Sequence, residues 1–195
     1  MRRVLVTGFE PFDGIETNAS WEAVRLLDGQ TVAGYRVAAR RLSCSFDRCV
    51  RELIDAIEET EPAAVLATGV NLTGTAIQVE RIAINLDDAR IADNDGAVPI
   101  DRTIAEIGPA AYFSELPVKA IVAAVADAQI PVVLSNSAGT YVCNHAFYGL
   151  MHYVATRQPR LRAGFIHVPP GLESPAVADA LRIAIERTLS AGPAG

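Results

Sequence analysis

The sequence predicts an α/β protein, a single three-layer α/β/α domain with a mostly parallel central sheet. Short runs rich in β-branched residues alternate along the chain with segments of helical periodicity, which is the pattern of βαβ units. The chain has 195 residues, of which 50% are hydrophobic and 21% charged, and this suits one folded core. We therefore expect one domain from Met1 to Gly195, with no internal repeat or linker.

The first part of the chain supplies three predicted strands and two predicted helices. The strands are Arg3 to Val6, Tyr35 to Cys44, and Ala63 to Ala67. The first helix begins near Asn18 or Ser20, because either side chain can cap a helix. The second helix shows a one-sided apolar stripe, formed by Phe46, Cys49, Val50, Leu53, Ile54 and Ile57.

The second part continues the alternation. The run Ile77 to Leu86 is a strand or one arm of a hairpin, and Asp87 to Pro99 is loop-like. The remaining predicted elements are a helix over Val118 to Ala128, a strand over Pro131 to Leu134, a helix from the loop at Thr140 to about Thr156, a strand over Arg162 to Val168, and a helix over Pro175 to Leu189.

Composition excludes several classes of protein. The net charge of -6 argues against binding to a nucleic-acid backbone. No apolar run is long enough to span a membrane, and the run after Arg2 and Arg3 stops at Thr7, which is too short for a signal peptide. Three cysteines make an odd count, so we expect a reduced, cytoplasmic thiol protein rather than a disulfide framework.

Three loops follow predicted strands, where α/β sheets bind their ligands. They are Thr7 to Gly14, Ser135 to Thr140, and His167 to Gly171. Phe9 and Phe12 flank a Glu-Pro pair in the first loop and could hold a flat ring. The alternative is that both aromatic side chains anchor the loop on the core.

Three side chains are candidates for catalysis. Cys143 falls in the first turn of a predicted helix, where the helix dipole would lower the pKa of a thiol. His167 ends a strand, and Glu80 is a carboxylate in an apolar run that needs a cationic partner. Structural roles stay open for all three: Cys143 as a core cysteine, His167 as a structural histidine and Glu80 as a charge at a sheet edge. Cys44 and Cys49 are expected to be inert.

A metal site is not expected. His145 and His152 are seven residues apart on one helix and share a face, but no third ligand has a matching spacing. Core or surface roles therefore suit both histidines better.

Five separated blocks, taken together, resemble one known family. In chain order they are Gly8 to Phe12 with Asn18, Glu80 to Asn85, Asp88 to Ile91 with Asp93 and Asn94, Ser137 to Asn144, and Gly164 to Pro169. Their order and spacing resemble the pyroglutamyl-peptidase I (pyrrolidone-carboxylate peptidase) family of cysteine peptidases. The resemblance runs from Val4 to about Pro169.

The resemblance implies a function and a set of site residues. It implies removal of an N-terminal pyroglutamyl (5-oxoproline) residue from peptides, with no metal or organic cofactor, and it allows a homo-oligomer. The family's catalytic glutamate, cysteine and histidine correspond to Glu80, Cys143 and His167. Arg90 corresponds to a residue near the reacting carbonyl, and the family's ring pocket corresponds to Phe9, Phe12, Asn18, Tyr141 and Val142.

Two other functions stay open. One is a catalytically silent homologue that binds a lactam-like ligand or a protein partner; Val70, where the family usually has glutamine, and the short segment after His167 favour it. The other is a nucleoside-processing enzyme on the same architecture, although no phosphate-binding glycine loop supports that activity.

Overall fold

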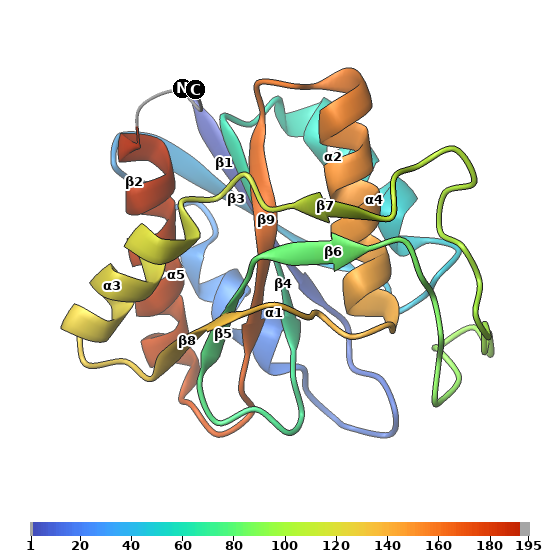
Figure 1. Cartoon of the computed structure of the whole chain (residues 1–195). Coiled ribbons are helices and arrows are strands. Elements are labelled where there is room, and N and C mark those ends of the chain that lie inside the picture. The colour runs from blue at the N-terminus through green and yellow to red at the C-terminus, as the bar shows by residue number, and fades with distance from the viewer. Residues whose placement is uncertain (1, 192–195) are drawn as a thin grey trace.

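A seven-stranded sheet runs through the middle of the molecule, with helices on both of its faces (Figure 1). The computed structural model describes residues 2–191. The strand order is β2-β3-β1-β4-β9-β5-β8. Its strands are β1 (Arg3–Phe9), β2 (Thr31–Val32), β3 (Tyr35–Leu42), β4 (Ala64–Val70), β5 (Ile77–Glu80), β8 (Val132–Ser135) and β9 (Arg162–Val168).

Two hydrophobic cores fill the space between the sheet and its helices. On one face, α1 (Ala19–Val24), α3 (Val118–Asp127) and α5 (Ser174–Ser190) cover a core that includes Val4, Val6 and Ile166. On the other face, α2 (Cys49–Thr60) and α4 (Val142–Arg157) cover a core that includes Leu5 and Phe165. Alternating residues of β1 thus enter opposite cores, as the pleat of a strand requires. The predicted three-layer α/β/α class is confirmed.

The sheet is mostly parallel, but its far edge is reversed. Strands β3, β1, β4 and β9 run parallel to one another, and the short edge strand β2 pairs antiparallel with β3. Strand β5 pairs antiparallel with β9, and β8 follows β5 in parallel, so both run against the central strands. The expectation of parallel pairing therefore holds between β5 and β8, with α3 between them in the chain, and is wrong for the β5–β9 pair. Pairing direction depends on how the connecting segments cross the sheet, which local periodicity does not report.

Most predicted elements occur at or near their expected positions. The apolar run that begins at Ile77 divides at Arg81 into β5 and β6 (Ile82–Ile84). Strand β6 leaves the main sheet and pairs with β7 (Ala111–Phe113) in a separate two-stranded sheet. The sequence analysis did not predict three short elements, namely β2, β7 and the 3₁₀ turn η1 (Arg25–Leu27). Each is too short to show a period.

The carboxyl ends of β1, β4 and β9 meet at the lower edge of the sheet in Figure 1. Within residues 2–191, no helix is long and apolar enough to cross a membrane.

Candidate active site

Glu80 and His167 form a buried pair between neighbouring strands. His167 is near the carboxyl end of β9, and Glu80 ends the antiparallel strand β5. Glu80 Oε1 lies 2.9 Å from His167 Nδ1, and the side chains are 0% and 7% exposed. Because a carboxylate only accepts hydrogen bonds, Nδ1 carries the hydrogen and Nε2 is left as the basic nitrogen. Glu80 Oε2 is buried without a protein hydrogen-bond partner.

Cys143 lies beside this pair at the start of α4. Helix α4 begins at Val142, and the first helical hydrogen bond runs from the N–H of His145 to the carbonyl of Tyr141. The N–H groups of residues 142 to 144 therefore have no partner inside the helix. A methyl group added to Gly69 would lie 2.6 Å from Cys143 Sγ. Because Gly69 is the Cα partner of His167 in the β4–β9 pairing, the sulfur lies beside the histidine strand.

The pKa of the Cys143 thiol is raised, chiefly by burial and further by Cys44 and Glu80. The expectation of a lowered pKa is therefore wrong. A thiolate loses more hydration energy on burial than one helix terminus returns to it. Burial of Cys143 therefore favours the thiol over the thiolate, and a base beside the sulfur is needed to take the proton.

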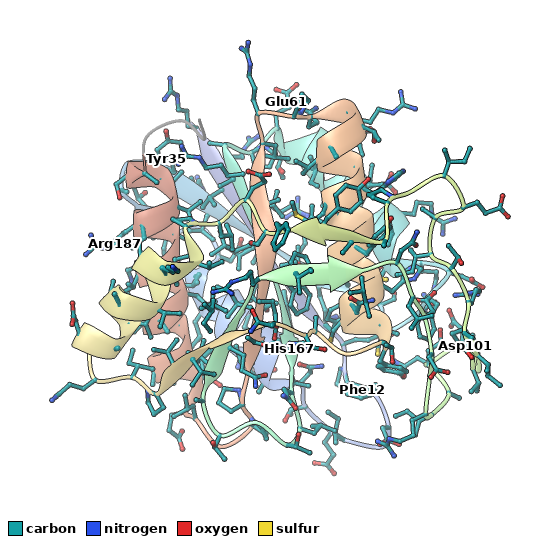
Figure 2. All side chains as sticks on the ribbon, in the orientation of Figure 1. Phe12, Tyr35, Glu61, Asp101, His167 and Arg187 are labelled. Atoms are coloured by element: carbon teal, nitrogen blue, oxygen red, sulfur yellow. The ribbon has the colours of Figure 1, made fainter. Side chains whose placement is uncertain are left out.

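A cavity of about 480 Å³ opens in front of Cys143 and His167. The three loops expected to meet here all contribute to it, although the Ser135 to Thr140 loop arrives from the reversed strand β8. Figure 2 shows Phe12 and His167 at this end of the molecule. The Phe12 ring is tilted against the ring of Tyr141, with centroids 6.0 Å apart. Phe9 lines the cavity too, but it is 2% exposed and also belongs to the core.

Polar side chains fix the loop that carries Phe12. Glu10 Oε1 accepts hydrogen bonds from the backbone N–H of Cys44, at 3.1 Å, and from Asn94 Nδ2, at 2.8 Å. The same amide donates to the Pro11 carbonyl at 2.9 Å. Asn18 caps α1 through a bond from the N–H of Ser20, and its Nδ2 donates to the Glu10 carbonyl. These bonds hold the aromatic wall in place before any ligand arrives.

Comparison with known proteins agrees with this geometry. The family model described as "Pyroglutamyl peptidase" matches residues 2–185. The chain belongs to the pyroglutamyl peptidase family. It is 48% identical, over 97% of its length and 94% of the relative, to a pyrrolidone-carboxylate peptidase of Pectobacterium carotovorum. A relative of that name in Cupriavidus pinatubonensis is 53% identical, over 87% of this chain and 79% of its own.

Solved structures of the pyroglutamyl peptidase family share the fold. The crystal structure of pyroglutamyl peptidase I from Bacillus amyloliquefaciens matches with a TM-score of 0.95 and 37% identity, covering 98% of both chains. Pyrrolidone carboxyl peptidase from Thermococcus litoralis matches with a TM-score of 0.93 and 37% identity, covering 97% of this chain and 94% of its own. The resemblance seen in the sequence is thereby confirmed.

The structure brings the predicted site residues of this pyroglutamyl peptidase family member to one place, with one exception. Eight of the nine line the cavity: Phe9, Phe12, Asn18, Arg90, Tyr141, Val142, Cys143 and His167. Glu80 stands behind His167. The Asn18 side chain caps α1 and holds the loop that carries Phe12, so its role in the cavity wall is also structural. Arg90 is exposed at the mouth.

Sequence reasoning missed several parts of the cavity wall. Cys44 was expected to be inert, yet it is buried and lines the cavity near Cys143. Leu72 and Thr73, in the loop after β4, also line it. A cysteine shortly after a strand gives no local signal that it lines a cavity. A leucine and a threonine in a loop give none either, because loop position is set by the strands on both sides.

The other two histidines have separate partners. His145 Nδ1 lies 2.9 Å from Asp87 Oδ2, and Asp87 also binds Arg102. His152 Nδ1 lies 2.9 Å from the Tyr112 hydroxyl. Among residues 2–191, no three histidine, cysteine or acidic side chains form a group that could hold a metal ion.

Proposed function

We propose that the protein is a cysteine peptidase that removes the N-terminal pyroglutamyl residue from peptides through a thioester acyl-enzyme. Cys143 is the nucleophile, His167 the general acid and base, and Glu80 the residue that orients His167. The observation that carries this proposal is the buried Glu80–His167 pair beside the Cys143 sulfur, at the end of an aromatic-walled cavity. Membership of the pyroglutamyl peptidase family supports it.

The reaction begins with a proton transfer. Burial raises the pKa of the Cys143 thiol, so His167 Nε2 accepts the thiol proton as the sulfur attacks the carbonyl carbon of the pyroglutamyl residue. Glu80 accepts a hydrogen bond from Nδ1–H and stabilises the imidazolium that forms, as the third residue of a triad does. The free N–H groups at the start of α4 can bind the oxyanion, and each good donor contributes about 3 kcal/mol.

The imidazolium then completes acylation. It gives its proton to the leaving amine, so that the peptide departs with a free N-terminus and the pyroglutamyl group remains on Cys143 as a thioester. Water, deprotonated by His167, hydrolyses the thioester and restores the thiol. The Phe12 and Tyr141 rings offer an uncharged surface that suits a lactam without an ionised amine.

The test is hydrolysis of a fluorogenic pyroglutamyl amide by the purified protein. We expect turnover in the unmodified protein, none in Cys143→Ala and nearly none in His167→Ala. Glu80→Gln should lose less, since glutamine can still accept from Nδ1–H but lacks the charge. Cys49→Ala is the control, because Cys49 is buried in the core outside the cavity. A folded protein without turnover would favour the silent homologue instead.

We also propose that the enzyme works as a homo-oligomer in the reducing cytoplasm. Its three cysteines are free thiols, and the reaction requires one of them. The segment between β6 and β7 exposes Val98, Ile100 and Ile107, at 48%, 75% and 98%, and exposed apolar patches often mark interfaces. Light scattering should show more than one copy per particle, and Ile107→Lys should reduce the mass.

A further inference from the structure

The loop of residues 71–76 crosses the end of the strand that carries His167. It connects β4 to β5, and these two strands are the neighbours of β9 on either side. The N–H of Asn71 donates to the Val168 carbonyl at 3.0 Å, which holds the loop against the end of β9. Any group that takes a proton from His167 therefore lies beside this loop.

The loop has a fixed shape centred on Asn71. Asn71 Nδ2 donates to Gln78 Oε1 at 2.8 Å, and Asn71 Oδ1 accepts from the Thr73 N–H at 3.1 Å and from its hydroxyl at 3.0 Å. The next residue, Leu72, stays 45% exposed. An apolar side chain is thus presented to solvent on a rigid support, at the rim of the catalytic cavity.

A second hollow lies on the other side of Leu72. It has a volume of about 300 Å³ and shares Val70 and Leu72 with the catalytic cavity. Its remaining apolar wall comes from Ile15 in the loop after β1, from Ala19 at the start of α1, and from Pro170 and Leu172 in the loop after β9. A peptide that leaves the catalytic cavity past Leu72 enters this hollow directly.

We propose that Leu72 and this second hollow bind the residue that follows the pyroglutamyl residue, and that they favour an apolar residue over an acidic one. The inference rests on the proposed function, because the direction of the peptide follows from His167 protonating the leaving amine. It adds a specificity site on the leaving side, in the loop between β4 and β5.

The charged side chains that line the second hollow favour an apolar leaving residue over an acidic one. The second hollow is lined by Glu22 and Glu173 and by no basic residue. Glu22 is paired with Arg25, whereas Glu173 is exposed at the start of α5. The catalytic cavity, in contrast, is lined by Arg90 as well as by Asp13 and Asp88. A leaving aspartate at the hollow would therefore meet carboxylates and no basic side chain, which disfavours it.

The experiment compares three substrates that differ only on the leaving side: pyroglutamamide, pyroglutamyl-leucine amide and pyroglutamyl-aspartate amide. For the unmodified protein we expect kcat/KM to be about ten-fold higher for the leucine than for the aspartate compound. In Leu72→Ser, the ratio of kcat/KM for the leucine compound to that for pyroglutamamide should fall about five-fold. Glu173→Gln should improve the aspartate compound relative to the leucine compound.

Leu26→Ser is the matched control, since Leu26 is an exposed leucine outside both hollows, and it should leave both ratios unchanged. An unchanged ratio in Leu72→Ser, or a preference for aspartate, would overturn the leaving-side site while leaving the peptidase activity established. If the unmodified protein hydrolyses none of the three compounds, the proposed function fails and this inference fails with it.

Discussion

Gly69 lies against the Cys143 sulfur, which is the nucleophile in the proposed reaction. It has no side chain, and that absence leaves room for Cys143 Sγ beside the β4–β9 pair. The same position in β4 would otherwise suit a β-branched residue, since every residue of the strand is buried. A glycine in such a strand is a mark of close approach by another group.

Gly69→Ala should therefore displace the sulfur without unfolding the protein. The added methyl would lie 2.6 Å from Sγ and 3.0 Å from Phe165 Cζ, and a shift of about 1 Å in a reacting atom can cost about 100-fold in rate. We expect kcat to fall by about that factor while KM changes little, and iodoacetamide to alkylate Cys143 more slowly. Leu26→Ala is the control, because Leu26 is exposed and lines neither hollow. Equal losses in both variants would contradict the prediction.

Phe12 is the aromatic residue whose removal tests the ring pocket most directly. It is only half-buried, whereas Phe9 is part of the core, so Phe12→Ala should fold. We expect kcat/KM for pyroglutamyl substrates to fall at least ten-fold, because the lactam loses one apolar wall. The rate of Cys143 alkylation by iodoacetamide should change less than two-fold. Phe113→Ala, at an exposed position outside the cavity, should alter neither rate; a parallel loss of both in Phe12→Ala would mean that the loop is structural.

At the scale of elements, α4 and β6 are joined by one buried side chain. Asn144, next to Cys143, accepts a hydrogen bond from the Ile84 N–H at 3.0 Å and donates to the Ile84 and Leu86 carbonyls. It is 0% exposed. These three bonds fix the start of α4 to the segment that leads into Asp88 and Arg90, so they hold Cys143, the proposed nucleophile, against one wall of the cavity.

Asn144→Ala should destabilise this junction. It would remove the Asn144 partner of the Ile84 N–H and of the Leu86 carbonyl, whereas the Ile84 carbonyl still accepts from the Leu86 N–H. Unsatisfied buried polar groups cost about 1–3 kcal/mol each. We expect the free energy of unfolding in urea to fall by about 2–4 kcal/mol and kcat/KM to fall as well. Gln158→Ala, at the exposed end of the same helix, should change stability by no more than about 0.5 kcal/mol. A neutral Asn144→Ala would show that the helix is held by packing alone.

At the scale of the whole molecule, three thiols titrate differently in the folded and unfolded chains. Burial raises the pKa of Cys44 to about 12, raises that of Cys49 well above its ordinary value, and raises that of Cys143. In the unfolded chain each would titrate near about 8.5. Above that pH the unfolded chain loses protons that the folded protein keeps. Ionisation of the thiols therefore stabilises the unfolded state relative to the folded state as the pH rises.

Stability should therefore fall steeply with rising pH above about 8.5. Each thiol contributes a slope of about 1.4 kcal/mol per pH unit once its unfolded form is ionised. The measurement is urea unfolding under reducing conditions between pH 8.5 and 10. Cys143→Ala should reduce the slope of the free energy of unfolding against pH by the contribution of one thiol. A single cooperative transition is expected if the chain is one domain. An unchanged slope would show that the folded Cys143 thiol ionises as easily as the unfolded one.

Much of the fold could be predicted from the amino-acid sequence because the signals are local. The existence of β4, β9 and α3 follows from residues a few positions apart, and so does a helix cap at Asn18 or Ser20, of which the structure selects Asn18. The same holds for the first-turn position of Cys143 in α4. Glu80 could be recognised as a buried carboxylate that needs a partner, because an apolar run predicts burial even when its neighbours in the fold are unknown.

Tertiary structure alone decided how these pieces face one another. The reversal of β5 and β8 turns Glu80 toward His167, and it depends on crossings between segments far apart in the chain. The raised pKa of Cys143 depends on burial by residues from several elements, and no neighbour in the sequence reports that burial. Leu72 lies at the rim of the cavity for the same reason: the sequence determined a loop after β4, and the positions of β4 and β5 on either side of β9 decided what that loop crosses.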